Sequence, residues 1–80
     1  MKITRLPNLK FNNKIQPELG SKIKKAREEC GLSQKELANQ MGLISATAIS
    51  FWESNKRTID AIKLWKISQI TNLPITFFIN

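Results

Sequence analysis

The sequence predicts a compact all-α domain of five helices, and three observations lead to that class. Apolar residues recur at intervals of three and four along most of residues 18–80, which is the period of an amphipathic helix. Glycine or asparagine follows several of these stretches, where it can end a helix in a left-handed turn. The same stretches show no credible pair of strands. With 80 residues, the chain fits a single domain.

The first two predicted helices have clear ends. One covers residues 18–30 and stops at Gly31. The next is capped by Ser33 and ends at Gly42, because Ser33 and Glu36 have the spacing of a capping box, in which each side chain accepts a hydrogen bond from the other residue's amide. The side chains expected to face the core are Leu19, Ile23, Ala26, Cys30, Leu37, Ala38 and Met41.

Three more helices are expected after a short turn. The third has Ser45 as its N-cap and ends near Asn55, a residue that tolerates a left-handed conformation. The fourth opens after Thr58 and runs to about Thr71, and Pro74 can serve as the first residue of a short last helix. The inward side chains are expected to be Ile49, Trp52, Ala61, Leu64, Ile67, Ser68, Thr71, Ile75, Phe78 and Ile79.

The charge is strongly positive and unevenly distributed. Thirteen lysine and arginine residues face six acidic residues, which gives a net charge of +7 and favours an anionic partner such as DNA, RNA or an acidic membrane. Residues 1–17 contain no acidic residue, and two prolines interrupt any regular element. We therefore expect two parts, an extended basic N-terminal arm over residues 1–17 and a folded domain over residues 18–80. The arm's basic residues are Lys2, Arg5, Lys10 and Lys14.

Several classes of protein are disfavoured by composition. The single cysteine, Cys30, cannot form an internal disulfide, and with no histidine in the chain no metal site is expected. No stretch has the length of a signal peptide or a membrane span, so we expect a cytoplasmic protein without a membrane partner. Histidine, paired carboxylates and a glycine-rich phosphate loop are all missing. An enzyme, a cofactor and a small-molecule substrate are therefore not expected.

Two charged residues fall on faces that should point inward. Arg27 lies on the apolar stripe of the first helix, and Glu53 lies on that of the third. Because a charge on an inward face needs a partner, we predict an ion pair between them that clamps the two helices together. The alternative is that one or both side chains extend to water.

The second and third predicted helices form a helix-turn-helix pattern, joined through residues 42–45. Residues within this segment and around it form a recognisable set: Gly20, Ile23, Arg27, Gly31, Leu32, Ser33, Gln34, Leu37, Ala38, Gly42, Ile49, Ser50, Trp52 and Glu53. With this set the chain resembles, over residues 20–78, the Cro/C1-type (XRE-like) helix-turn-helix repressors of phages and bacterial mobile elements. The resemblance implies a lambda-repressor-like domain whose third helix enters the major groove of DNA.

The resemblance also assigns roles to individual side chains. Base edges would be contacted by Ala46, Thr47, Ala48, Ser50 and Phe51. DNA phosphates would be contacted by Gln34, Lys35, Ser45, Lys56 and Arg57. Gln34 could instead brace the third helix, and Phe51 could pack on the surface of the domain. Since the base-contacting side chains are short, affinity should depend strongly on the lysines and the arm.

One departure from the family pattern concerns the turn. Between Gly42 and Ile49 the chain has one residue more than the family norm, and we place the addition at Ile44. The turn can absorb it, but a shifted start of the third helix would rotate the base-contacting residues by about 100° per residue.

Some apolar residues remain after the core is assigned, and two explanations are open. They could form a homodimer interface that pairs two third helices on a palindromic site. Alternatively, a wider core could include Trp65. The residues concerned are Ile62, Trp65, Ile70 and Phe77.

The functional expectation is a sequence-specific DNA-binding transcription regulator, a repressor of a phage or mobile element. The alternative is a protein-interaction or antitoxin-like module with the same fold, which would use Ala46, Ala48 and Phe51 as an apolar contact surface. Steep salt dependence of binding to any DNA duplex would separate the two.

Overall fold

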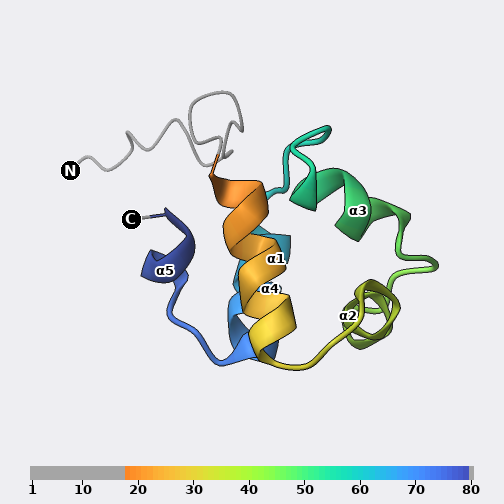
Figure 1. Cartoon of the computed structure of the whole chain (residues 1–80), viewed down its shortest axis with the longest axis horizontal. Helices are drawn as coiled ribbons and strands as arrows, with labels where there is room; N and C mark the ends of the chain where they lie inside the picture. Colours follow the sequence, from red (N-terminus) through yellow and green to blue (C-terminus); the bar gives the residue numbers. More distant parts are fainter. Residues whose placement is uncertain (1–17, 80) are drawn as a thin grey trace.

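A computed structural model describes residues 18–79 as five helices without a strand (Figure 1). The all-α, five-helix prediction is therefore confirmed for this part of the chain, while the predicted basic arm lies outside the described residues. Within residues 18–79, no helix combines the length and apolarity needed to cross a membrane. The helices are α1 (Leu19–Glu29), α2 (Gln34–Gln40), α3 (Thr47–Glu53), α4 (Ala61–Thr71) and α5 (Ile75–Ile79).

α1 is the central element, since it contacts α3, α4 and α5. In Figure 1, α2 and α3 lie on one side of α1 and α5 lies on the other. α2 packs against α3, and α5 returns the chain to α1 and α4. α3 is thus held at one side of the domain by its contact with α1, and α2 is held there by its contact with α3.

The core consists mainly of the apolar side chains expected from the sequence, with some differences. Ala61, Ile75 and Ile79 were expected to face inward and are only half-buried. Cys30 is exposed, because it follows the last turn of α1, and its thiol donates a hydrogen bond to the carbonyl oxygen of Thr71 at 3.5 Å. Ile59 is fully buried although it lies in a loop, where no helical period marks it as inward. The buried apolar residues are Leu19, Ile23, Ala26, Leu37, Ala38, Met41, Ile49, Trp52, Ile59, Leu64, Ile67 and Phe78.

Some of the helices begin with the capping residues that the sequence predicts, and others do not. Both hydrogen bonds of the Ser33–Glu36 capping box are present, with N···O distances of 3.0 and 2.8 Å. α4 begins after Asp60, whose carboxylate accepts a hydrogen bond from the Lys63 amide at 2.8 Å. Pro74 precedes α5 instead of opening it, and its carbonyl accepts a hydrogen bond from the Phe77 amide at 2.9 Å.

Candidate nucleic-acid interface

α2 and α3 are joined by a compact turn that begins at Met41. Gly42 has a positive φ of 76°, which glycine adopts without steric cost. The Leu43 amide then donates a hydrogen bond to the Ala38 carbonyl at 2.9 Å, which ties the turn back to α2. Ile44 follows in the turn with its side chain fully exposed.

α3 begins later than the sequence predicts, which corrects the role of Ser45. Ala46 is the N-cap and provides no side-chain hydrogen bond. The Ser45 hydroxyl oxygen accepts a hydrogen bond from the Thr47 amide at 3.3 Å and donates one to the Thr47 hydroxyl at 3.1 Å. Ser45 therefore closes a local turn with Thr47 before the helix, a geometry that serine adopts as readily as a cap.

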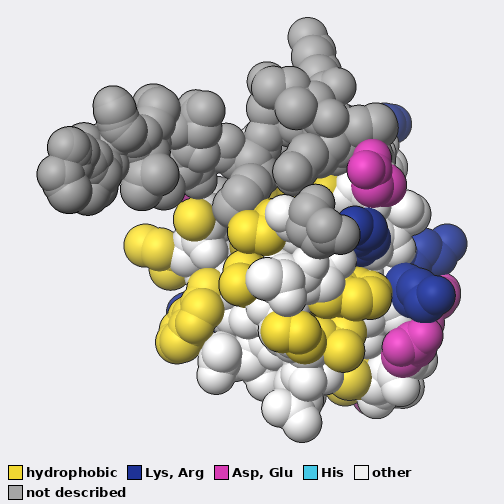
Figure 2. All heavy atoms as spheres, turned by 90° about the vertical axis from the view of Figure 1, so that its left-hand side faces the viewer, with side chains coloured by type: hydrophobic (Ala, Val, Ile, Leu, Met, Phe, Trp, Pro, Cys, Tyr) yellow, Lys and Arg dark blue, Asp and Glu magenta, His cyan; other side chains and the backbone are white. Residues whose placement is uncertain are grey.

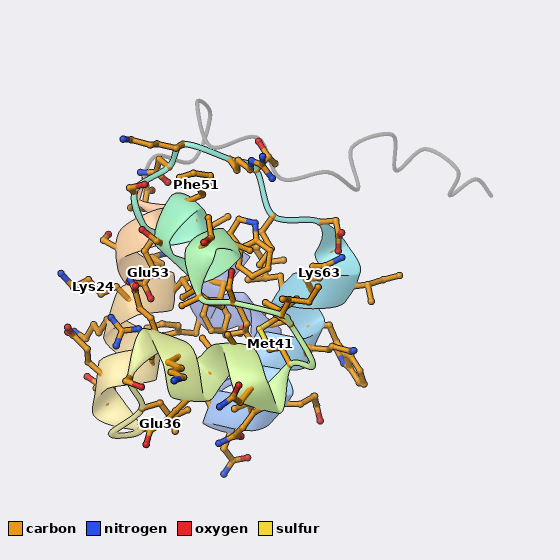
Figure 3. All side chains as sticks on the ribbon, turned by 90° about the vertical axis from the view of Figure 1, so that its right-hand side faces the viewer. Lys24, Glu36, Met41, Phe51, Glu53 and Lys63 are labelled. Atoms are coloured by element: carbon orange, nitrogen blue, oxygen red, sulfur yellow. The ribbon has the colours of Figure 1, made fainter. Side chains whose placement is uncertain are left out.

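The residues expected to contact bases do not share one environment. Thr47 and Ser50 are exposed on α3. Ala46 and Ala48 are half-buried and pack against the core, so their methyl groups are only partly available. Phe51 is also half-buried, and Figure 3 shows it on a different side of α3 from Glu53.

The predicted contact between Arg27 and Glu53 is present. Arg27 Nε donates to Glu53 Oε2 at 2.6 Å, and Arg27 Nη2 donates to Glu53 Oε1 at 3.1 Å. The two side chains are 10% and 6% exposed, so the pair is shielded from water. This bidentate geometry joins α1 to the last residue of α3.

Gln34 and the Leu32 carbonyl add two hydrogen bonds to the Arg27–Glu53 pair. Gln34 Nε2 donates to Glu53 Oε1 at 3.0 Å, which is the bracing role that the sequence left open for Gln34. Arg27 Nη1 donates to the Leu32 carbonyl at 2.8 Å. The hydrogen bond to Glu53 raises the pKa of Arg27 above its ordinary value, in spite of burial, so the guanidinium stays charged. A single carboxylate therefore connects α1, α2 and α3.

A second connection between α1 and α3 depends on a glycine. The Gly20 amide donates to Asn55 Oδ1 at 3.2 Å, and Asn55 has a positive φ of 63° just after α3. A Cβ atom at Gly20 would lie 2.5 Å from the Glu53 carbonyl oxygen and 2.8 Å from that of Trp52. Gly20 is thus required by close backbone approach, which a single sequence does not reveal.

A shallow, open depression of about 480 Å³ lies on the outer face of the turn and α3. Thr47, Ala48 and Phe51 line it together with the turn residues 42–45, and Arg57 completes its wall. The guanidinium carbon of Arg57 lies 5.2 Å from the centroid of the Phe51 ring, a cation–π contact that no local pattern in the sequence predicts. Among the other cations proposed to contact phosphate, Lys35 and Lys56 are both exposed.

The apolar residues assigned to a possible dimer interface divide into two kinds. Ile62 and Trp65 on α4 are 71% and 54% exposed, so the alternative of a wider core that includes Trp65 is wrong. Ile70 and Phe77 are half-buried and pack against the core. Figure 2 shows apolar side chains gathered on the side of the domain formed by α4 and α5, away from the turn.

Comparisons with known proteins agree with this architecture. A sequence profile of the helix-turn-helix family matches residues 23–78. Two proteins described as uncharacterized HTH-type transcriptional regulators, from Sinorhizobium medicae and Rhizobium meliloti, are each 36% identical over 73 residues. The match covers 91% of this chain, which spans about half (52%) of the length of these relatives.

The fold also matches a solved structure, the crystal structure of SinR, the master regulator for biofilm formation, in complex with DNA. The TM-score is 0.69 at 30% sequence identity, and the match covers 78% of this chain and 98% of the SinR chain. The chain belongs to the Cro/C1-type helix-turn-helix family of DNA-binding domains from transcription regulators.

Proposed function

We propose that this chain binds a short duplex DNA site through α3 and represses transcription for a phage or mobile element by occupying its operator. The observation that carries the proposal is the position of α3, which packs against α1 and α2 and whose exposed side chains include Thr47 and Ser50. The Arg27–Glu53 ion pair and the hydrogen bond from the Gly20 amide to Asn55 hold the end of this helix against α1. A helix fixed in this way can enter a major groove without losing much conformational freedom.

The neighbouring cations extend the proposed contact beyond α3. Lys35 lies on α2, before the turn, and Lys56 follows α3; both are exposed. Together with the Ser45 hydroxyl and Arg57, they would contact phosphates on either side of the groove. Gln34 would join this set through its second amide N–H, since the other N–H is donated to Glu53.

Recognition of the base sequence would depend on a small number of short side chains. The Thr47 hydroxyl can donate to a base edge, and the methyl groups of Thr47 and Ala48 suit contact with the methyl group of thymine. Repression would follow from occupation alone, since bound protein excludes the polymerase. Two copies paired through Ile62 and Trp65 on α4 would place two α3 helices on half-sites about 34 Å apart.

The test is selection of bound sequences from random duplex DNA, followed by affinity measurements at several salt concentrations. We expect one short sequence to be enriched, and binding to weaken steeply as salt rises. A Thr47→Ala variant should then lose preference at one base pair while its thermal midpoint is unchanged, because Thr47 is exposed. Absence of any enriched sequence would contradict the proposal.

A second candidate, a protein-interaction module, is supported by one observation. Ile44 is fully exposed at the rim of the depression, beside the half-buried Ala48 and Phe51. Apolar side chains that lie together on a surface, as these do around the depression, can form a contact site for another protein. In that case any binding to duplex DNA would be weak and without sequence preference, which the same selection would reveal.

A further inference from the structure

Ile44 differs from its apolar neighbour in the turn between α2 and α3. Its side chain is fully exposed, whereas Leu43 packs against the core. In Figure 1 this turn lies at the edge of the domain, away from α1. An exposed apolar side chain therefore lies just before α3, the helix proposed to contact DNA.

The backbone on both sides of Ile44 is held by hydrogen bonds. Before it, the Leu43 amide donates to the Ala38 carbonyl at 2.9 Å. After it, the Ser45 hydroxyl accepts from the Thr47 amide at 3.3 Å. Isoleucine is branched at Cβ, which restricts rotation about its first side-chain bond. The side chain is thus presented in few conformations, so it loses little conformational freedom when it contacts a ligand.

Ile44 also belongs to a larger apolar surface. It lines the same depression as Ala48 and Phe51, and Thr47 lies there with them. A single exposed isoleucine says little about function, whereas apolar side chains that gather around a depression mark a contact site. The side chains of isoleucine, alanine and phenylalanine have no hydrogen-bonding group. They are therefore suited to an apolar group on a ligand and unsuited to a phosphate.

We infer that Ile44 contacts the 5-methyl group of one thymine in the bound DNA, an inference that rests on the proposed function. Among the base edges displayed in the major groove, the thymine methyl is the apolar group. With the first turn of α3 in the groove, Thr47 and Ala48 would approach this methyl from the helix, and Ile44 would cover it from the turn. Ile44 is then a specificity-determining residue, although it lies outside α3.

The charge of the chain favours DNA over a protein as the occupant of this surface. The net charge is +7, and the exposed Lys35 lies on α2, the helix that leads into the turn. A duplex offers phosphates to such cations and methyl groups to the apolar side chains. A protein that covered Ile44 instead would leave the affinity for DNA independent of this side chain.

The test removes one methyl group at a time from the DNA. Each thymine of the selected site is replaced in turn by uracil, which keeps the hydrogen-bonding groups of the base and lacks only the 5-methyl group. At one thymine, the affinity of the unaltered chain should fall about fourfold, the factor expected for burial of one methyl group. In Ile44→Ala the ratio of the two affinities at this position should fall to about one. Ile44→Val, which keeps a branched apolar side chain, should retain most of the ratio.

Ile62→Ala is the matched control, because Ile62 is also an exposed isoleucine but lies on α4. It should leave the ratio of thymine to uracil affinity unchanged, whatever its effect on the affinity for both duplexes. Thermal unfolding should give the same midpoint for the Ile44 variants and the unaltered chain, because the Ile44 side chain lies outside the core.

Two outcomes would overturn the inference without affecting the proposed function. A selected site without thymine, or one in which uracil replaces every thymine without loss of affinity, contains no methyl group that the protein reads. Alternatively, Ile44→Ala with an unchanged thermal midpoint could retain the full ratio, which would assign the methyl contact to another side chain. If the unaltered protein enriches no sequence at all, the proposed function itself fails.

Discussion

Gly20 in α1 lies directly against the backbone of Glu53 in α3, so closely that a Cβ atom would sit 2.5 Å from the Glu53 carbonyl oxygen. Glu53 in turn binds Arg27 through its carboxylate. The backbone and the side chain of one residue therefore hold the end of α3 against α1. The orientation of the proposed DNA-contacting helix depends on these two contacts.

Replacement of Gly20 by alanine should destabilise the domain in spite of alanine's higher helix propensity. The added methyl group meets backbone atoms that can move only if α3 moves, and such overpacking costs about 1–3 kcal/mol. Urea unfolding monitored by circular dichroism would measure the effect. Lys24→Ala, on the exposed side of the same helix, is the control and should change stability little. Equal stability of the Gly20 variant and the original chain would contradict the close contact.

Removal of either member of the Arg27–Glu53 pair should destabilise the domain by about 3–5 kcal/mol, because the remaining charge stays buried without its partner. Glu53→Ala and Arg27→Met, with the double variant, form a cycle that isolates the interaction. Glu28→Gln provides the control, because Glu28 is 56% exposed and lies 3.9 Å from Arg27. That control should cost less than about 1 kcal/mol. Additive single effects would show that the two residues do not interact.

Because the Asp60 carboxylate caps α4, the free energy of unfolding of the domain should depend on pH in the acidic range. The hydrogen bond from the Lys63 amide lowers the pKa of Asp60, so this contribution is present above the ordinary aspartate pKa. It is lost as the pH falls through the lowered pKa of the folded state. Asp60→Ala should therefore cost about 1 kcal/mol at neutral pH, and the difference should narrow on acidification to about pH 3. Urea unfolding of both proteins across this range is the measurement. A difference that stays constant or widens in acid would contradict the assignment.

A dimer formed through α4 should be disrupted by a charge at the exposed apolar residues of that helix, Ile62 and Trp65. Lysine in place of Ile62 and Trp65 should abolish dimer formation while leaving the folded monomer stable, because both side chains lie outside the core. Analytical ultracentrifugation over a range of concentrations would measure this. Replacement of the exposed Lys66 by alanine keeps the apolar residues and serves as a control. A strict monomer at high concentration of the unaltered chain would contradict dimerisation through this surface.

Local signals in the sequence predict much of this domain. The Ser33–Glu36 spacing identifies the start of α2, since both hydrogen bonds form within one turn. Arg27 and Glu53 are marked by charge on inward faces, which leaves few structural solutions.

Features that depend on how the helices cross were not predictable in the same way. The need for glycine at position 20 arises only from the approach of α1 to α3. Ile59 is buried from a loop without periodicity. The preference of serine for N-cap positions predicts Ser45 as the N-cap of α3, whereas the N-cap in the structure is Ala46. The contact between Arg57 and Phe51 likewise requires the loop after α3 to fold back.

The most direct test of the central claim is to observe which residues contact DNA. Nuclear magnetic resonance spectra of the ¹⁵N-labelled chain should be recorded during titration with the selected duplex and, as a control, with a scrambled duplex of equal length. We predict that the largest amide shift changes occur at residues 44–51, 56 and 57, and that they are specific to the selected duplex. Changes concentrated on α4 and α5, with the amides of α3 unaffected, would contradict the account.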